Sequence, residues 1–131
     1  MLISIKIILS RSDFMQHLYE LTNKLIFELE HLKKVFYQPN DPEVDKHVFF
    51  HFVKVQTTPV FNLLKKWEDK ALTFVKEEYG YVHPKQIIAT KENMELLLLH
   101  SYYKDIRKRR FMEYYSSCKY VFNQLEEEIK L

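Results

Sequence analysis

The chain has 131 residues, of which 47% are hydrophobic and 29% charged, and its formal net charge at pH 7 is +2. These values fit one folded domain, exclude an intrinsically disordered chain, and give no overall charge that would favour nucleic acid or a membrane. No stretch approaches the ~18–20 consecutive apolar residues of a membrane span, and a single cysteine excludes an internal disulfide. We therefore expect a cytoplasmic protein. One glycine and four prolines are too few for the turns of a β-rich fold, which favours long helices.

Residues 1–11, MLISIKIILSR, form an apolar N-terminal extension before a single domain that we place at residues 12–131. Taken alone the extension resembles a strand, but a lone strand has no partner in a helical chain. Three alternatives stay open: one or two extra turns of the first helix, a tail docked on the domain, or a segment that precedes the natural start. We favour the extra turns.

The first long helix is expected over residues 12–37, with Ser12 as its N-cap. It ends before the turn-forming segment 39–42, because residues before proline avoid the helical region. Glu28 and His31 form a Glu-x-x-His pair, which is half of the motif of di-iron bundles. The sequence holds no second copy, so we interpret the pair as part of a charged outer face. The predicted core stripe recurs at spacings of three and four: Phe14, Leu18, Leu21, Leu25, Leu29, Leu32 and Phe36.

A second helix is expected over residues 43–78. Pro59 lies inside its pattern and removes one backbone hydrogen bond, so we predict a kink near Pro59 and no chain reversal. Glu43, His47 and His51 would then be four apart on one face, where two histidines can share a metal. A stable zinc site needs three or four ligands, and we predict no metal or cofactor. The predicted core stripe is Phe49, Phe52, Val60, Leu63, Trp67, Ala71 and Phe74.

The connection 79–84 holds the only glycine and three exposed-type side chains, Tyr79, Tyr81 and His83, which are a candidate partner surface. The alternative, which we favour, is that Tyr81 and Val82 fold back as a hydrophobic staple.

A third helix is expected from Pro84 to Tyr103, because proline fits the first helical position. Leu96–Leu99 are four consecutive leucines, and four consecutive helical positions point all the way round. No side of this segment would face water comfortably. We therefore expect this helix near the centre of the bundle.

A basic segment follows, and we place a chain reversal at residues 104–108 within it. Its positive charges are candidates for contact with an anion such as a phosphate. The alternative, which we favour, is a solvated turn whose arginine stems cover the end of the bundle. The candidate contact residues are Lys104, Arg107, Lys108, Arg109 and Arg110.

The last helix has the most regular pattern in the chain, with alternating steps of four and three. Cys118 lies on this seam and is predicted to be a buried, unreactive thiol. The seam residues are Phe111, Tyr115, Cys118, Phe122, Leu125 and Ile129.

These residues also suggest a family. The segments 81–87, 96–98, 101–102 and 108–111, with similarity over 59–67, resemble the YppE-like proteins, which are small bacterial four-helix bundles of unknown function. The resemblance covers residues 12–131 and is strongest after Pro59. It implies an all-α, up-and-down four-helix bundle and no chemistry, because no catalytic motif defines the family.

We find no nucleophile–base pair, metal set or phosphate-binding glycine loop in the sequence, so we expect a protein that is not an enzyme. The favoured hypothesis is an interaction or adaptor module that binds another protein, or its own copy, through exposed aromatic residues around Tyr79, Tyr81, Tyr114 and Tyr120. The alternative is nucleic-acid or other anion binding through Lys104–Arg110.

Overall fold

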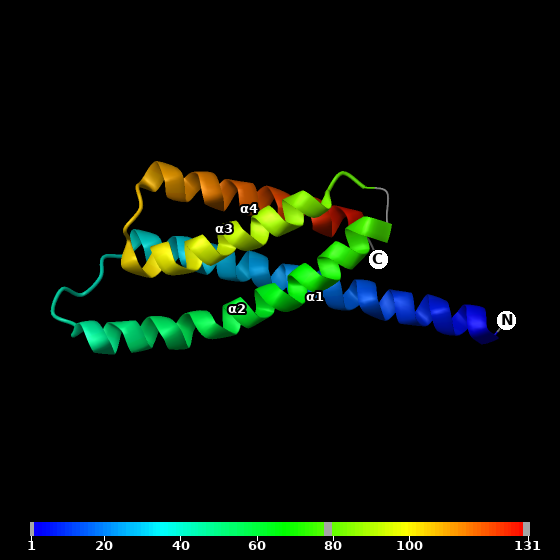
Figure 1. Ribbon diagram of the computed structural model, residues 1–131, viewed down its shortest axis with the longest axis horizontal. Coiled ribbons are helices and arrows are strands. Elements are labelled where there is room, and N and C mark those ends of the chain that lie inside the picture. Colours follow the sequence, from blue (N-terminus) through cyan, green and yellow to red (C-terminus); the bar gives the residue numbers. More distant parts are fainter. Residues whose placement is uncertain (1, 78–79, 130–131) are drawn as a thin grey trace.

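The computed structural model describes residues 2–77 and 80–129, and its regular structure in this part of the chain is helical throughout. Successive helices run in opposite directions (Figure 1). This arrangement confirms the predicted all-α, up-and-down four-helix bundle. No helix in the described residues is long and apolar enough to cross a membrane. The helices are α1 (Leu2–Tyr37), α2 (Lys46–Glu77), α3 (Pro84–Tyr103) and α4 (Lys108–Ile129).

The bundle has two diagonal pairs of helices: α1 and α3 lie close together, and α2 and α4 lie further apart. α1 and α3 each contact the other three helices, whereas the described Cα atoms of α2 and α4 nowhere approach within 8 Å. The central position of α3 agrees with the prediction. The expectation that no side of Leu96–Leu99 faces water is wrong, because Leu97 and Leu98 are buried while Leu96 and Leu99 are exposed. A helix packed in a bundle keeps one wet side even where its sequence is entirely apolar.

α1 is one continuous helix from Leu2, so residues 2–11 are helical turns, the alternative that we favoured. Ser12 lies inside this helix, and its predicted role as an N-cap is wrong. The buried leucines of α1 begin at Leu18 among the described side chains. The first turns of α1 extend beyond the other three helices at the right of Figure 1.

α2 begins at Lys46, three residues later than predicted, because Asp45 caps it. One carboxylate oxygen of Asp45 accepts the backbone N–H groups of His47 (2.8 Å) and Val48 (3.3 Å). These are two of the donors that a helix leaves unpaired at its start, so a cap here fixes where the helix begins.

α2 continues through Pro59 without a break, and its axis changes direction along its length in Figure 1. The two halves of the helix are packed very differently. In the N-terminal half only Val53 and Thr57 are buried, whereas the C-terminal half buries Val60, Leu64, Trp67, Ala71, Phe74 and Val75.

Three residues predicted for the core of α2 are therefore misplaced. Phe49 and Leu63 are only partly buried, and Phe52 is exposed. In the N-terminal half of α2, two different sets of apolar residues fit the helical period. The structure buries the set that contains Val53 and Thr57.

The predicted stripes of α1 and α4 are buried almost in full. On α1 only Phe14 is less than buried, and the stripe of α4 is buried throughout. Phe36 of α1 and Phe111 of α4 stack with ring centroids 4.0 Å apart and close one end of the core.

A short polar relay crosses this core. The Thr22 hydroxyl of α1 donates to the Leu18 carbonyl (2.8 Å) and accepts the indole N–H of Trp67 (3.0 Å). Thr22 and Trp67 are fully buried, and the indole also meets the Phe122 ring of α4 edge to face, with centroids 5.1 Å apart. One side chain of α2 is thus held by both α1 and α4, although the backbones of α2 and α4 do not touch.

We expect Thr22→Val to lower the free energy of unfolding by about 1–3 kcal/mol, because it leaves the buried indole N–H without an acceptor. In a Trp67→Phe background the same change removes no hydrogen bond between the helices, so its cost should be much smaller. Urea unfolding followed by circular dichroism measures both. An equal cost in the two backgrounds would show that the relay does not stabilise the fold.

Candidate interaction surfaces

The basic segment Lys104–Arg110, which we call the basic turn, reverses the chain at the predicted place. α3 ends at Tyr103, and Lys104 then takes the left-handed conformation (φ 55°) while its N–H donates to the His100 carbonyl at 2.8 Å. His100 also lies 2.6 Å from the Asp105 carboxylate, and this hydrogen bond lowers the pKa of Asp105. The turn is therefore fixed by local hydrogen bonds without glycine or proline.

The side chain of Lys104 is directed into the end of the bundle. Its ammonium donates to the carbonyls of Val35, Phe36 (3.3 Å) and Ser101 (3.0 Å). These carbonyls belong to the last turns of α1 and α3, where helical partners are missing. Burial lowers the pKa of Lys104, while the three acceptors favour its charged form. Lys104, predicted as an anion contact, thus caps two helices.

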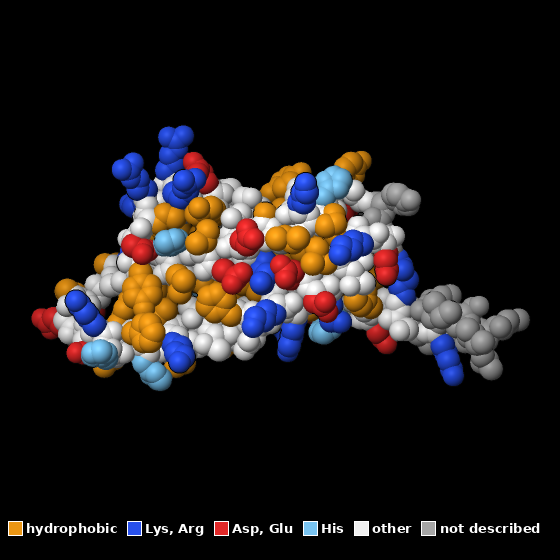
Figure 2. Space-filling model, viewed as in Figure 1, with side chains coloured by type: hydrophobic (Ala, Val, Ile, Leu, Met, Phe, Trp, Pro, Cys, Tyr) orange, Lys and Arg blue, Asp and Glu red, His pale blue; other side chains and the backbone are white. Residues whose placement is uncertain are grey.

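The other four predicted contact residues, Arg107–Arg110, are exposed and lie together at the start of α4. Figure 2 shows the cationic side chains gathered at this corner of the molecule. Arg109 and Arg110 share one carboxylate, that of Glu113, at 3.5 and 3.6 Å. Lys108 lies over the Tyr37 ring, with its ammonium 5.6 Å from the ring centroid. The charged groups of these four side chains are therefore exposed to solvent.

The predicted partner surface at residues 79–83 is only partly described. Tyr79 lies outside the described residues. Tyr81 is 81% exposed, whereas Val82 is buried, so the predicted staple holds for Val82 alone. His83 is exposed, precedes α3 as its N-cap, and donates its backbone N–H to the Gln86 side chain at 2.8 Å.

Glu128 of α4 secures this connection. One of its carboxylate oxygens accepts the backbone N–H groups of Tyr81 (2.5 Å) and Val82 (3.1 Å). A Cβ atom built on Gly80 would collide with the same carboxylate. Glycine therefore leaves room for the observed position of the Glu128 carboxylate.

The histidines do not form the arrangements weighed from the sequence. Glu43 lies in a turn before α2, so Glu43, His47 and His51 do not share one helical face as supposed. Within residues 2–77 and 80–129 no three His, Cys, Asp or Glu side chains gather where they could hold a metal ion. Glu28 and His31 line a hollow between α1 and α2.

Cys118 is fully buried, as predicted. Burial raises the pKa of its thiol to about 12, so the thiolate is not populated near neutral pH.

The seam between α1 and α4 is closed by a polar network. The Tyr115 hydroxyl donates to the Glu30 carboxylate at 2.5 Å, and the Lys119 ammonium lies 3.2 Å from both. The hydrogen bond from Tyr115 lowers the pKa of Glu30. Lys33 lies over the Tyr115 ring, 4.8 Å from its centroid.

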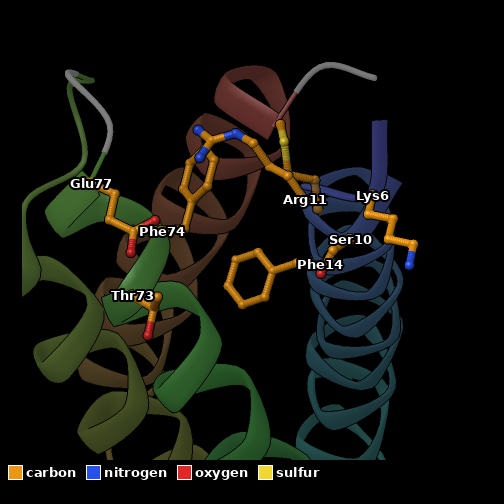
Figure 3. Close-up of a pocket in the computed structure, with 8 residues that line it drawn as sticks. Lys6, Ser10, Arg11, Phe14, Thr73, Phe74 and Glu77 are labelled. Atoms are coloured by element: carbon orange, nitrogen blue, oxygen red, sulfur yellow. The ribbon is translucent and has the colours of Figure 1, made fainter. Parts of the chain in front are cut away.

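The seam between α1 and α2 is open at both ends. Near the C-terminus of α2 a hollow of about 430 Å³ lies between the helices, and Phe14 of α1 points into it towards Thr73 and Phe74 of α2 (Figure 3). Near the N-terminus of α2 two hollows of about 390 and 270 Å³ adjoin, because His31, Gln56 and Tyr102 line both.

Large apolar side chains are exposed at these adjoining hollows and along the neighbouring part of α2. Phe27 of α1 is 73% exposed, and on α2 Val48, Phe52 and Val55 are 62%, 48% and 53% exposed. With the exposed Pro59 the three α2 residues form a line along the helix, which we call the outer stripe. The outer stripe and Phe27 together are called the apolar face.

Sequence reasoning missed the apolar face. It assigned Phe52 to the core and left Val48 and Val55 unassigned. The available signal was an excess of apolar residues in the N-terminal half of α2, which carries more of them than one core stripe can hold.

A family model for a bacterial domain of unknown function, DUF1798, matches residues 22–129. The chain belongs to this family. The uncharacterized protein YppE of Bacillus subtilis (strain 168) is a relative, 31% identical over 115 residues, which are 87% of this chain and 93% of YppE.

Solved structures agree. The crystal structure of B. subtilis yppE gives a TM-score of 0.75 at 29% identity and covers 87% of this chain and 93% of that one. A crystal structure of a Listeria innocua protein of unknown function gives 0.76 at 15% identity, covers 90% and 94%, and shows the same fold. These findings confirm the YppE-like resemblance. Membership of the DUF1798 family therefore supports the fold and assigns no activity to the chain.

Measuring the free energy of unfolding can separate the capping role of Lys104 from the role of the exposed cations of the basic turn. We expect Lys104→Met to lower the free energy of unfolding by about 1–2 kcal/mol, because carbonyls at the ends of α1 and α3 lose their donor. Arg109 is 93% exposed, so Arg109→Met should change the free energy of unfolding by less than about 0.5 kcal/mol. Urea unfolding compares the two variants. Equal effects would contradict the capping role of Lys104.

Proposed function

We propose that this DUF1798 protein is a non-enzymatic protein-interaction module and that it binds its partner through the apolar face. The observation that carries the proposal is the exposure of Phe27, Phe52 and Val55 around two adjoining hollows, with the exposed Val48 next along the same side of α2. A contiguous exposed apolar surface of this kind marks an interaction site in soluble proteins more often than it marks chance.

The bundle itself does not explain why these residues are apolar. Phe27, Val48 and Val55 are outside the buried core, and Phe52 contributes to it only by one edge-to-face contact with the Tyr102 ring, with centroids 6.0 Å apart. Polar residues at positions 27, 48 and 55 would be compatible with the same packing. Water contact with aromatic and branched side chains is unfavourable by ~25 cal/mol per Å², and a partner that covers them removes this cost.

The hollows give the surface relief as well as apolarity. Tyr102 of α3 lines both of them together with His31 and Gln56, so apolar walls surround a few polar groups. Such concave surfaces accept protruding side chains of a partner and use the polar groups to orient them.

The proposal predicts that Phe27→Glu abolishes partner binding without unfolding the bundle, because a charge would be buried in the contact. The tagged protein is used for capture from native cells, with nuclease present, and bound proteins are identified by mass spectrometry. Tyr120→Glu is the matched control, since Tyr120 is a 62% exposed aromatic residue of α4. Partners that remain on Phe27→Glu but are lost from Tyr120→Glu would move the contact to another surface.

Anion binding by Arg107–Arg110 is the second candidate. It is favoured by the arrangement of the charges: four consecutive exposed cations have the single carboxylate of Glu113 as their ion-pair partner among the described contacts. Positive charge at the start of a helix opposes the helix dipole, so the cluster is not placed for the stability of α4.

This candidate predicts binding of a fluorescently labelled DNA duplex that weakens steeply as salt rises, because phosphate contacts release counterions. Arg109→Glu should weaken it at least about tenfold, and Lys85→Glu, an exposed cation on α3, should have little effect. Anisotropy titrations at two salt concentrations measure both. Equal binding by the two variants would exclude the basic turn as the contact.

A further inference from the structure

We propose that the partner of the apolar face is a second copy of this chain, packed so that the N-terminal halves of the two α2 helices lie antiparallel across a twofold axis. This inference rests on the proposed function and names the partner. Three observations carry it: the spacing of the outer stripe, the placement of charge at its two ends, and its position on a half-helix that the bundle barely covers.

The spacing of the outer stripe is the same in both directions. Val48, Phe52, Val55 and Pro59 are separated by four, three and four residues. At ~100° per residue they fall within an arc of about 60° on one side of α2. When a second copy is laid antiparallel about the midpoint of this stripe, Val48 meets Pro59 and Phe52 meets Val55. A twofold interface requires such self-complementarity, because the same patch appears on both subunits.

The charges at the two ends of the stripe have opposite sign. Asp41 and Glu43 precede it in the exposed turn before α2, and Lys65 and Lys66 follow it on the exposed side of the helix. In the antiparallel arrangement the acidic turn of one copy comes to the end of the stripe that is followed by Lys65 and Lys66 in the other copy. A parallel arrangement would place acid against acid. The charge pattern therefore selects the antiparallel pair.

The half-helix that carries the stripe has little other cover. Only Val53 and Thr57 of its residues are buried, so the outer stripe is accessible to a second helix along its whole length. From Val48 to Pro59 the helix rises about 17 Å, and stable interfaces bury about 800 Å² on each partner. The stripe alone is smaller than this. Phe27 extends it across the seam, and we expect a reversible, concentration-dependent dimer.

Sedimentation velocity between about 1 µM and 1 mM tests the inference. The wild-type chain should shift from monomer to dimer over this range. Phe52→Glu should raise the dissociation constant by about tenfold or more, because the twofold axis buries two carboxylates against apolar side chains. Phe50→Glu is the matched control: Phe50 is 62% exposed on the same half of α2 but lies on the opposite side of the helix from the stripe. Circular dichroism verifies that each variant is folded.

A charge exchange tests the antiparallel register. Lys66→Glu and Glu43→Lys should each weaken the dimer several-fold, and the combined variant should restore it, because both symmetric contacts regain opposite charge. Asp45 is left unchanged, since it caps α2. Failure of the combined variant to recover dimerisation, while each single variant weakens it, would overturn the register.

A wild-type chain that stays monomeric up to 1 mM would overturn the inference, and so would a dimer that Phe52→Glu leaves intact. Neither result decides the proposed function. If the chain is monomeric and Phe27→Glu still loses a captured cellular protein, the apolar face binds a different partner and the interaction role stands.

Discussion

The contact between the Trp67 indole and the Thr22 hydroxyl is the constraint on which the arrangement of the helices depends. Thr22 uses its proton on the Leu18 carbonyl and an oxygen lone pair on the indole N–H, so both buried polar groups are satisfied. The indole also packs against Phe122, and a bulky ring in this position sets the distance between α2 and α4. The open long diagonal of the bundle follows from this, since α2 and α4 meet through side chains and not through their backbones.

The same contact divides α2 into two parts. Beyond Trp67 the helix is buried at regular intervals up to Val75, whereas before Pro59 only two residues are buried. Proline removes one hydrogen bond and displaces the preceding turn, so the N-terminal half need not follow the axis of the other half. The divergence opens the seam with α1 and leaves the hollows lined by Gln56 and Tyr102. One half of α2 therefore builds the core and the other half builds a surface.

Periodicity predicted the buried faces of α1 and α4 well because each carries one apolar stripe. The seam of α4 is the clearest case, from Phe111 to Ile129, and burial of Cys118 followed directly from it. The N-terminal half of α2 failed because it is apolar on two sides, and spacing alone cannot decide which side meets α1 and α3. The basic turn was located correctly, yet the inward position of Lys104 could not be foreseen. Its three acceptors come from Val35, Phe36 and Ser101, and two of these lie almost 70 residues away in the chain. Composition likewise gave no sign that Gly80 makes room for Glu128.

The apolar face and the basic turn differ in how much they contribute to the stability of the fold and in the cost of their exposure to water. Lys104 shows that a charged residue of the turn can be fully used by the bundle, and Arg107–Arg110 then remain as charges that water can solvate at little cost. Exposed Phe27, Phe52 and Val55 have no such alternative, because water does not compensate apolar surface. A bundle already held by Trp67 on one diagonal and by the Glu30–Tyr115–Lys119 network along the α1–α4 seam gains little from them, since of the three only Phe52 makes a ring contact, with Tyr102. These residues contribute little to the fold while their exposure is unfavourable, and for this reason our proposal places the interaction site on the apolar face.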